Sequence, residues 1–108
     1  MIPILHIFDQ TSWHDDVIIA GNEKGFRNLY EALGRILDPA NTVELSKVFV
    51  NDREGYDIVL IKEKDSTKLD KLMVPYTAEY AMDVDETHLT PYNLINEDEY
   101  QKKMALKK

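Results

Sequence analysis

VIIAGNEKGFRNLYEALGRIL, residues 17–37, is the stretch that decides the fold class. Its first four residues are a short apolar run with β-branched side chains, which suits a strand better than a helix. Gly21 and Asn22 end that run, and an asparagine here can accept hydrogen bonds from the free N–H groups of a first helical turn. The stretch therefore predicts a short strand followed directly by a helix over 22–37.

Apolar residues within 22–37 recur at the helical period and form one stripe, which predicts a helix that packs on a core. Gly34 weakens this helix by about 1 kcal/mol relative to alanine, and we expect close approach to a sheet to compensate. Asp38-Pro39 ends the helix because the residue before a proline avoids the helical conformation. The stripe consists of Phe26, Leu29, Tyr30, Leu33, Ile36 and Leu37.

Other segments have strand character. Residues 2–8 are a continuous apolar run. Residues 43–50 change the parity of their apolar positions, which predicts a bulge near Ser46-Lys47 or a strand that starts there. Residues 51–55 form a hairpin turn that ends in glycine. Residues 56–62 are apolar on both parities, which predicts a central strand covered on both faces.

The C-terminal third is less regular. A charged segment over 63–71, either a loop or a loop with one helical turn, precedes a weak strand at 72–74. Asn96 caps a terminal helix that is acidic at its start and lysine-rich at its end. We therefore expect a single domain over 1–108 of the α+β class. It has a mainly antiparallel sheet of four to five strands, one long helix on a face and a C-terminal helix or arm. The other sheet face needs cover, from the tyrosine-rich segment or from a second copy.

Composition excludes several function classes. The chain has 108 residues, with 20 acidic and 13 basic side chains and a formal net charge of −7. This charge disfavours binding to nucleic acid or to an anionic membrane. Cysteine is absent, so disulfides and thiolate chemistry are excluded. Pro3 and His6 interrupt the first apolar run, and no apolar stretch reaches the roughly 20 residues that span a bilayer. We expect a cytoplasmic protein.

The histidines offer little chemistry. His6 lies in an apolar run and predicts a core or edge position. His14 precedes two carboxylates, a pattern that suits a general base or a metal ligand, but a solvated turn is the favoured interpretation. The segment 83–88 is dense in oxygen and nitrogen ligands, yet His88 stands where a calcium-binding EF-hand loop requires glycine.

The Gly21–Gly25 turn lies where a phosphate-binding loop would lie, between a strand and a helix. It lacks the Gly-Lys-Ser/Thr ending and the Gly-x-Gly-x-x-Gly pattern of nucleotide sites, and Glu23 would repel phosphate. No Gly-x-Ser-x-Gly elbow is present. The sequence predicts no catalytic residues, no cofactor and no metal.

A binding surface is the remaining candidate. Between Pro75 and Tyr100 the chain has no lysine or arginine, and seven acidic residues alternate with four tyrosines. Tyrosine offers a large contact area at low entropic cost, and carboxylates steer a cationic partner. A solvated face with tyrosines in the core is the alternative interpretation. The expected partner-binding residues are Tyr76, Tyr80, Asp83, Asp85, Glu86 and Tyr92.

Residues 17–37 resemble the opening of small immunity proteins from bacterial polymorphic toxin systems. In several such families a short strand ends in Gly-Asn, and a helix with a Gly-Phe/Leu-x-x-Leu-x-x-x-Leu spacing follows. The matching positions are Gly21, Asn22, Gly25, Phe26, Leu29 and Leu33.

This resemblance covers about a fifth of the chain. It implies a protein that binds a cognate toxin, with a basic nuclease as the expected kind, and blocks it stoichiometrically by occlusion. A homodimer is compatible with this interpretation. The alternative is a small adaptor or regulatory subunit that binds another protein through its acidic, tyrosine-rich C-terminal third.

Overall fold

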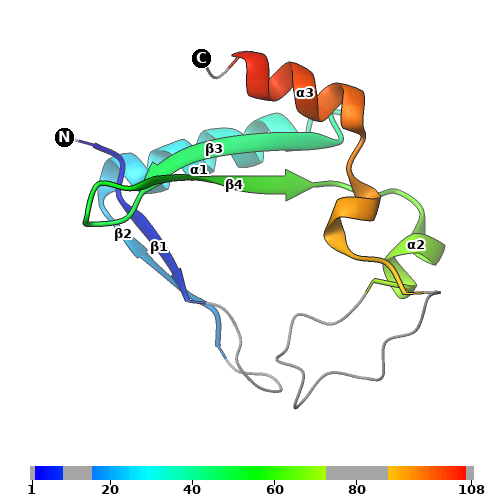
Figure 1. Cartoon of the computed structure of the whole chain (residues 1–108), viewed down its shortest axis with the longest axis horizontal. Helices are drawn as coiled ribbons and strands as arrows, with labels where there is room; N and C mark the ends of the chain where they lie inside the picture. Colours follow the sequence, from blue (N-terminus) through cyan, green and yellow to red (C-terminus); the bar gives the residue numbers. More distant parts are fainter. Residues whose placement is uncertain (1, 9–15, 73–87, 107–108) are drawn as a thin grey trace.

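The computed structural model describes residues 2–8, 16–72 and 88–106 and shows an α+β arrangement, as the sequence predicts (Figure 1). A long helix and a shorter C-terminal helix accompany two β-hairpins. The elements in chain order are β1 (Leu5–Phe8), β2 (Ile18–Gly21), α1 (Glu23–Ile36), β3 (Val43–Phe49), β4 (Gly55–Ile61), α2 (Ser66–Asp70), the 3-10 helix η1 (Pro91–Leu94) and α3 (Glu97–Leu106).

The strands form two separate antiparallel pairs, β1–β2 and β3–β4. The expected single sheet of four to five strands is therefore wrong for the described residues. The pairs meet at one parallel bridge between Ile4 and Phe49, where the Phe49 N–H donates to the Pro3 carbonyl at 2.9 Å. Beyond this bridge the β1–β2 hairpin runs away from β3 (Figure 1), so the two ladders cannot merge.

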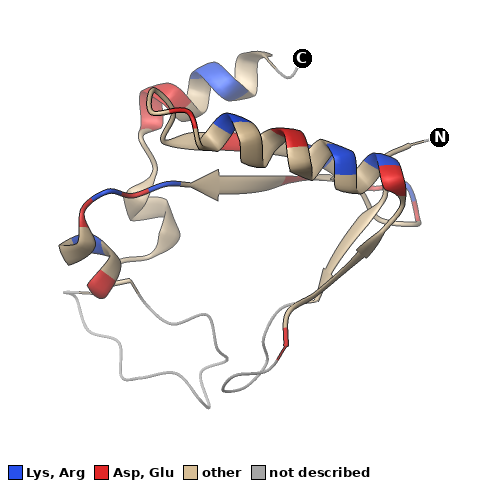
Figure 2. Ribbon diagram, turned by 180° about the vertical axis from the view of Figure 1, so that it is seen from behind, with Lys and Arg blue, Asp and Glu red and all other residues tan. Residues whose placement is uncertain are grey.

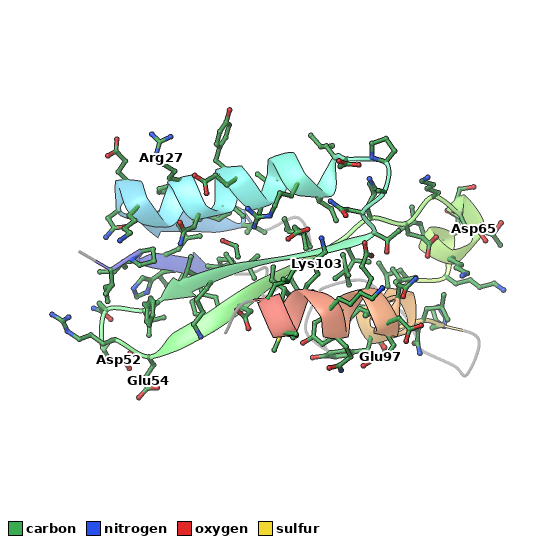
Figure 3. The ribbon with its side chains drawn as sticks, turned by 90° about the horizontal axis from the view of Figure 1, so that it is seen from above. Arg27, Asp52, Glu54, Asp65, Glu97 and Lys103 are labelled. Atoms are coloured by element: carbon green, nitrogen blue, oxygen red, sulfur yellow. The ribbon has the colours of Figure 1, made fainter. Side chains whose placement is uncertain are left out.

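Strand β3 is the centre of the structure. Figure 3 shows α1 and α3 along opposite sides of it. Its residues Val43 to Ser46 and Val48 are buried, whereas β4 is half-buried or exposed along its length. The expectation of a central strand at 56–62 is thus wrong. The strand covered on both faces is β3, because α1 and α3 both pack on it.

The burial of β3 on both faces also explains why its apolar residues change from one parity to the other. Its pairing with β4 is continuous, from Val43 opposite Ile61 to Phe49 opposite Gly55, so the expected bulge near Ser46-Lys47 is wrong. A strand that is buried on both faces has apolar residues on both parities without any break in register.

Asn22 joins the N-terminal segment to the start of α1. Its side-chain Oδ1 accepts from the N–H of Gly25 at 2.8 Å and from the N–H of Ile4 at 3.0 Å. Its Nδ2 donates to the Ile2 carbonyl at 2.9 Å. The predicted cap is confirmed, and α1 begins one residue later. The same amide also holds the chain that leads into β1.

Gly21 and Gly25 are required by close packing against Ile4. A Cβ on either glycine would lie 2.1 Å from the Ile4 carbonyl oxygen. The backbone of the N-terminal segment therefore fills the space in front of α1 where a bound phosphate would lie. The spacing of the two glycines serves packing, which agrees with the interpretation of this turn as a strand-to-helix connection.

The apolar stripe of α1 divides into two faces. The buried residues of the helix are Gly25, Ala32 and Ile36. Two of these are small, so the helix axis comes close to the strands and the large stripe residues are turned outward. The expectation that the whole stripe packs on the sheet is therefore wrong. Leu29 is half-buried, and the exposed fractions are 42 % for Phe26, 71 % for Tyr30, 45 % for Leu33 and 74 % for Leu37.

Of the elements that follow β4, α2 and η1 lie beyond the end of that strand, and α3 runs back along β3 (Figure 1). Asp65 caps the short helix α2, and Asn96 accepts from the Glu99 N–H at 3.1 Å at the start of α3, as predicted. Of the expected strand at 72–74 only Leu72 is described, in a parallel bridge with Leu89. In the described ranges no helix combines the length and apolarity that crossing a membrane requires.

Candidate protein-binding surfaces

The predicted partner-binding residues lie mostly outside the described part of the chain. Tyr76, Tyr80, Asp83, Asp85 and Glu86 fall within 73–87, which the structure does not describe. Tyr92 is the described member of the set, and its side chain is 83 % exposed on η1. Its exposure agrees with a contact role and excludes a core role for this tyrosine.

The short helix η1 holds Tyr92 through a local turn. The Thr90 N–H and hydroxyl both approach the Asn93 side-chain oxygen, at 2.7 and 3.0 Å. Pro91 begins the helix, where its missing N–H costs nothing. These contacts fix the backbone under Tyr92 and leave the ring in solvent.

The β1–β2 hairpin is an apolar surface that sequence analysis did not single out. Ile7 pairs with Ile19 on one face, and Phe8 pairs with Ile18 on the other. All four side chains are at least 37 % exposed, and every residue of β2 is classed as exposed. A two-stranded pair has two faces, and among the described residues both faces carry exposed apolar side chains.

The sequence signal for this surface is the run of β-branched residues 17–19, which is apolar on consecutive positions. Such a run normally marks a strand buried on both sides. Strand β2 thus has the composition of a buried strand but is exposed. Asp16, an acidic residue, is the first described residue before β2.

A second apolar surface lies on α1 and on its C-cap residue Leu37. We call it the α1 flank, and it consists of Phe26, Tyr30, Leu33 and Leu37. Asn28 and Arg35 lie on the opposite side of the helix, at about 100° per residue. Those two side chains donate to the Lys47 and Leu45 carbonyls of β3, each at 3.0 Å. The α1 flank therefore points away from the outer edge of β3. A shallow hollow of about 370 Å³ lies beside Phe26 and Tyr30.

Glu44 links the two helices through β3. Its carboxylate accepts from Arg35 Nε at 3.0 Å and from Lys103 Nζ at 2.6 Å. Burial alone would raise the pKa of Glu44, but the hydrogen bonds and charges of Lys103 and Arg35 outweigh it and lower the pKa. The cluster lines a groove of about 340 Å³ between α1 and α3. Its charges are paired with one another, which makes it a structural clamp.

Glu99 on α3 binds backbone N–H groups at the start of β3. Its carboxylate accepts from the Thr42 N–H at 2.9 Å, from the Val43 N–H at 3.0 Å and from the Thr42 hydroxyl. Burial would raise the pKa of Glu99, but these hydrogen bonds lower it overall. The outer edge of β3 has no neighbouring strand along Val43 to Lys47 in the described structure. Side chains bond to backbone N–H and carbonyl groups along this edge in place of a strand.

Two of the three histidines lie in the described part of the chain. His6 is half-buried and stacks on Phe8, with ring centroids 6.1 Å apart. His88 is half-buried, and His14 lies outside the described residues. Within 2–8, 16–72 and 88–106, no three His, Cys, Asp or Glu side chains converge as metal ligands would.

Comparisons of this chain with protein-family models, with curated proteins and with solved structures found no match. The candidate surfaces are therefore assessed on their geometry alone.

Proposed function

We propose that this protein works by binding another protein stoichiometrically, and that its partner is a toxin that it neutralises. One observation carries the proposal. In the described part of the chain, thirteen large hydrophobic side chains are at least 37 % exposed, whereas six hydrophobic side chains form the core. Apolar side chains gathered on exposed elements mark sites of protein contact. The proposal includes a cytoplasmic location, where an immunity protein meets its toxin.

The β1–β2 hairpin is the toxin-binding surface in this proposal. Its apolar side chains lie on both faces, so insertion into a groove of the partner would bury more area than contact with a flat surface. The antiparallel pairing with β1 leaves the outer edge of β2 without a neighbouring strand in the described structure. An open strand edge supplies backbone hydrogen bonds to a partner.

The identity of the partner rests on charge and on the resemblance of residues 17–37 to immunity proteins. A chain with a net charge of −7 attracts a basic protein such as a nuclease. The acidic, tyrosine-rich segment contributes to this attraction through Asp83, Asp85 and Glu86. In this proposal the carboxylates speed association, and the apolar hairpin slows dissociation.

The first experiment measures binding of the chain to the toxin domain encoded beside its gene. A Phe8→Asp/Ile18→Asp variant should lose binding by a factor of roughly 100, because it places charge on an apolar contact. Leu106→Asp is the matched control, since Leu106 is 81 % exposed on α3. Loss of protection by the hairpin variant alone supports the proposal. No binding by the unaltered chain to any neighbouring gene product would favour an adaptor role instead.

The second experiment separates steering from contact. Changing Asp83, Asp85 and Glu86 together to lysine should lower the association rate by roughly tenfold at low salt and flatten its salt dependence. Stopped-flow mixing over a range of ionic strength measures both. An unchanged rate would remove the acidic segment from the interface and leave the hairpin as the proposed surface.

A further inference from the structure

The α1 flank has a spacing that the hairpin lacks. Its members lie at positions 26, 30, 33 and 37, with steps of four, three and four residues. This is the spacing of the apolar seam in a coiled coil, where each member packs into a gap on a facing helix. The helix packs on the strands through Gly25, Ala32 and Ile36, so the flank is a second seam, and its side chains are exposed in the described structure.

The seam is symmetric about its own midpoint, between residues 31 and 32. Two copies of α1 placed antiparallel about a twofold axis at that point bring Phe26 opposite Leu37 of the second copy. Tyr30 then lies opposite Leu33. Each aromatic ring meets a leucine in both directions, which is the self-complementarity that a twofold interface requires. We infer that the α1 flank is the interface of an antiparallel homodimer of this protein.

Charge favours a second copy at this place. The whole chain is acidic, and two copies would repel one another through most of their surface. Helix α1 is an exception, because Glu23 and Arg27, which line the hollow beside Phe26 and Tyr30, balance one another. Figure 2 shows acidic and basic residues mixed along the helix. Two copies can therefore meet along α1 without bringing acidic surfaces together.

Gly34 supplies an independent argument. The sequence predicts that close approach to a sheet compensates for its helix-weakening effect, but a Cβ at Gly34 would meet nothing within 4 Å. The expected compensation is therefore not found among the described residues. Gly34 borders the α1 flank, directly after Leu33. In the antiparallel dimer it leaves room for the large ring of Tyr30 from the second copy, which is 71 % exposed in one chain alone.

The area of the flank sets the strength of the dimer. At about 150–250 Å² per aromatic side chain, Phe26 and Tyr30 leave roughly 200 Å² open on each copy, to which Leu33 and Leu37 add. The total for two copies falls at the small end of specific interfaces, below about 1,200 Å². The dimer is therefore reversible, and its population depends on protein concentration.

Sedimentation velocity of the full chain over a wide concentration range tests the dimer. The unaltered protein should shift from monomer to dimer, and Tyr30→Glu should raise the dissociation constant at least tenfold. Tyr92→Glu is the matched control, because it makes the same change at a tyrosine outside the flank that is also largely exposed, at 83 % against 71 % for Tyr30. A monomer at every concentration, or equal effects of the two variants, overturns the inference.

Folding is checked at the same time. Tyr30→Glu and Leu37→Gln should melt at the temperature of the unaltered monomer, since both side chains are more than 70 % exposed. If both variants instead lower the melting temperature of a monomeric protein, the flank is covered within one chain and the inference is wrong.

Cysteine pairing tests the orientation, because the chain has no cysteine of its own. Phe26→Cys mixed with Leu37→Cys should form a disulfide-linked heterodimer under mild oxidation. Neither variant alone should crosslink, since identical positions lie about 16 Å apart along the antiparallel axis, beyond disulfide reach. A crosslinked homodimer of Phe26→Cys would indicate parallel helices and overturn the proposed interface. Toxin binding does not enter these measurements, so they are decided independently of the proposed function.

Discussion

The two β-hairpins of this protein are similar in composition and opposite in environment. Hairpin β3–β4 has α1 on one side and α3 on the other, and its first strand is buried on both faces (Figure 3). Hairpin β1–β2 is also apolar on both faces, but its side chains are largely exposed beyond Leu5. An apolar pattern on both parities thus predicts that both faces of a strand are buried. It does not predict whether the chain itself or another molecule buries them.

The largest expected effect comes from a paired substitution across the two hairpins. Leu45→Ala in β3 should lower the free energy of unfolding by about 3 kcal/mol, because the side chain is 7 % exposed and leaves a cavity. Ile18→Ala in β2 should change it by about 0.5 kcal/mol or less, since this side chain is 57 % exposed. Urea unfolding measures both. Equal losses would show that the β1–β2 hairpin is covered within the monomer.

The next effect concerns the anchor of β1–β2. Gly25→Ala places a methyl group 2.1 Å from the Ile4 carbonyl oxygen, and the backbone must shift to accept it. We expect a loss of about 2–3 kcal/mol, as for other overpacked sites. Gly34→Ala is the control, because it adds the same group in open space and should raise helix stability by up to about 1 kcal/mol. Thermal unfolding at low protein concentration compares the two, and a tolerated Gly25→Ala would contradict the close packing at Ile4.

A smaller effect tests the clamp on β3. The pKa values of Glu44 and Glu99 are lowered in the folded state, so both carboxylates stabilise the fold above their unfolded pKa of about 4.5. That stability should be lost as pH falls through the lower folded values. Glu44→Gln should cost about 1–2 kcal/mol at pH 7 and reduce the slope of stability against pH below 4.5. Urea midpoints between pH 7 and pH 3 measure this, and an unchanged slope would contradict the clamp.

The smallest effect lies in the turn of β3–β4. Arg53 has a φ of 73°, in the left-handed region that disfavours side chains with a Cβ. Arg53→Gly removes this strain and adds flexibility to the unfolded chain, so we expect a net gain of about 0.5 kcal/mol. Thermal unfolding beside Arg53→Gln, which removes the charge but keeps the Cβ at the same position, separates the backbone effect from loss of charge. Destabilisation of the turn variant would show that the Arg53 side chain makes a stabilising contact.

Local signals in the sequence predicted the helices well. The cap at Asn22, the stop at Asp38-Pro39 and the cap at Asn96 each depend on a few neighbouring residues, and α1 and α3 begin where these residues indicate. The strands β3 and β4 were also placed within one residue of their observed ends. These features come from backbone preferences, which act over short distances.

The failures concern contacts between distant segments. The side of α1 that packs on the strands contains the small residues Gly25 and Ala32. Because these residues add little to a hydrophobic pattern, the pattern predicts the wrong side of the helix. The cover of β3 depends on Glu99, which is 57 residues away from Thr42 in the chain. Of the predicted binding residues, Tyr92 alone is described. The sequence predicts the β1–β2 hairpin only as strands and does not indicate that its apolar side chains are exposed.

The Glu99 contact also has a consequence for synthesis on the ribosome. Strands β3 and β4 leave the exit tunnel well before α3 is translated, so β3 emerges with the N–H groups of Thr42 and Val43 open. During that interval the strand can pair with other nascent chains. Packing of α3 closes this edge through Glu99, so the fold of β3 is complete only when α3 is in place. A chain truncated before Asn96 should therefore be lost to aggregation and proteolysis, even though its core residues are all present.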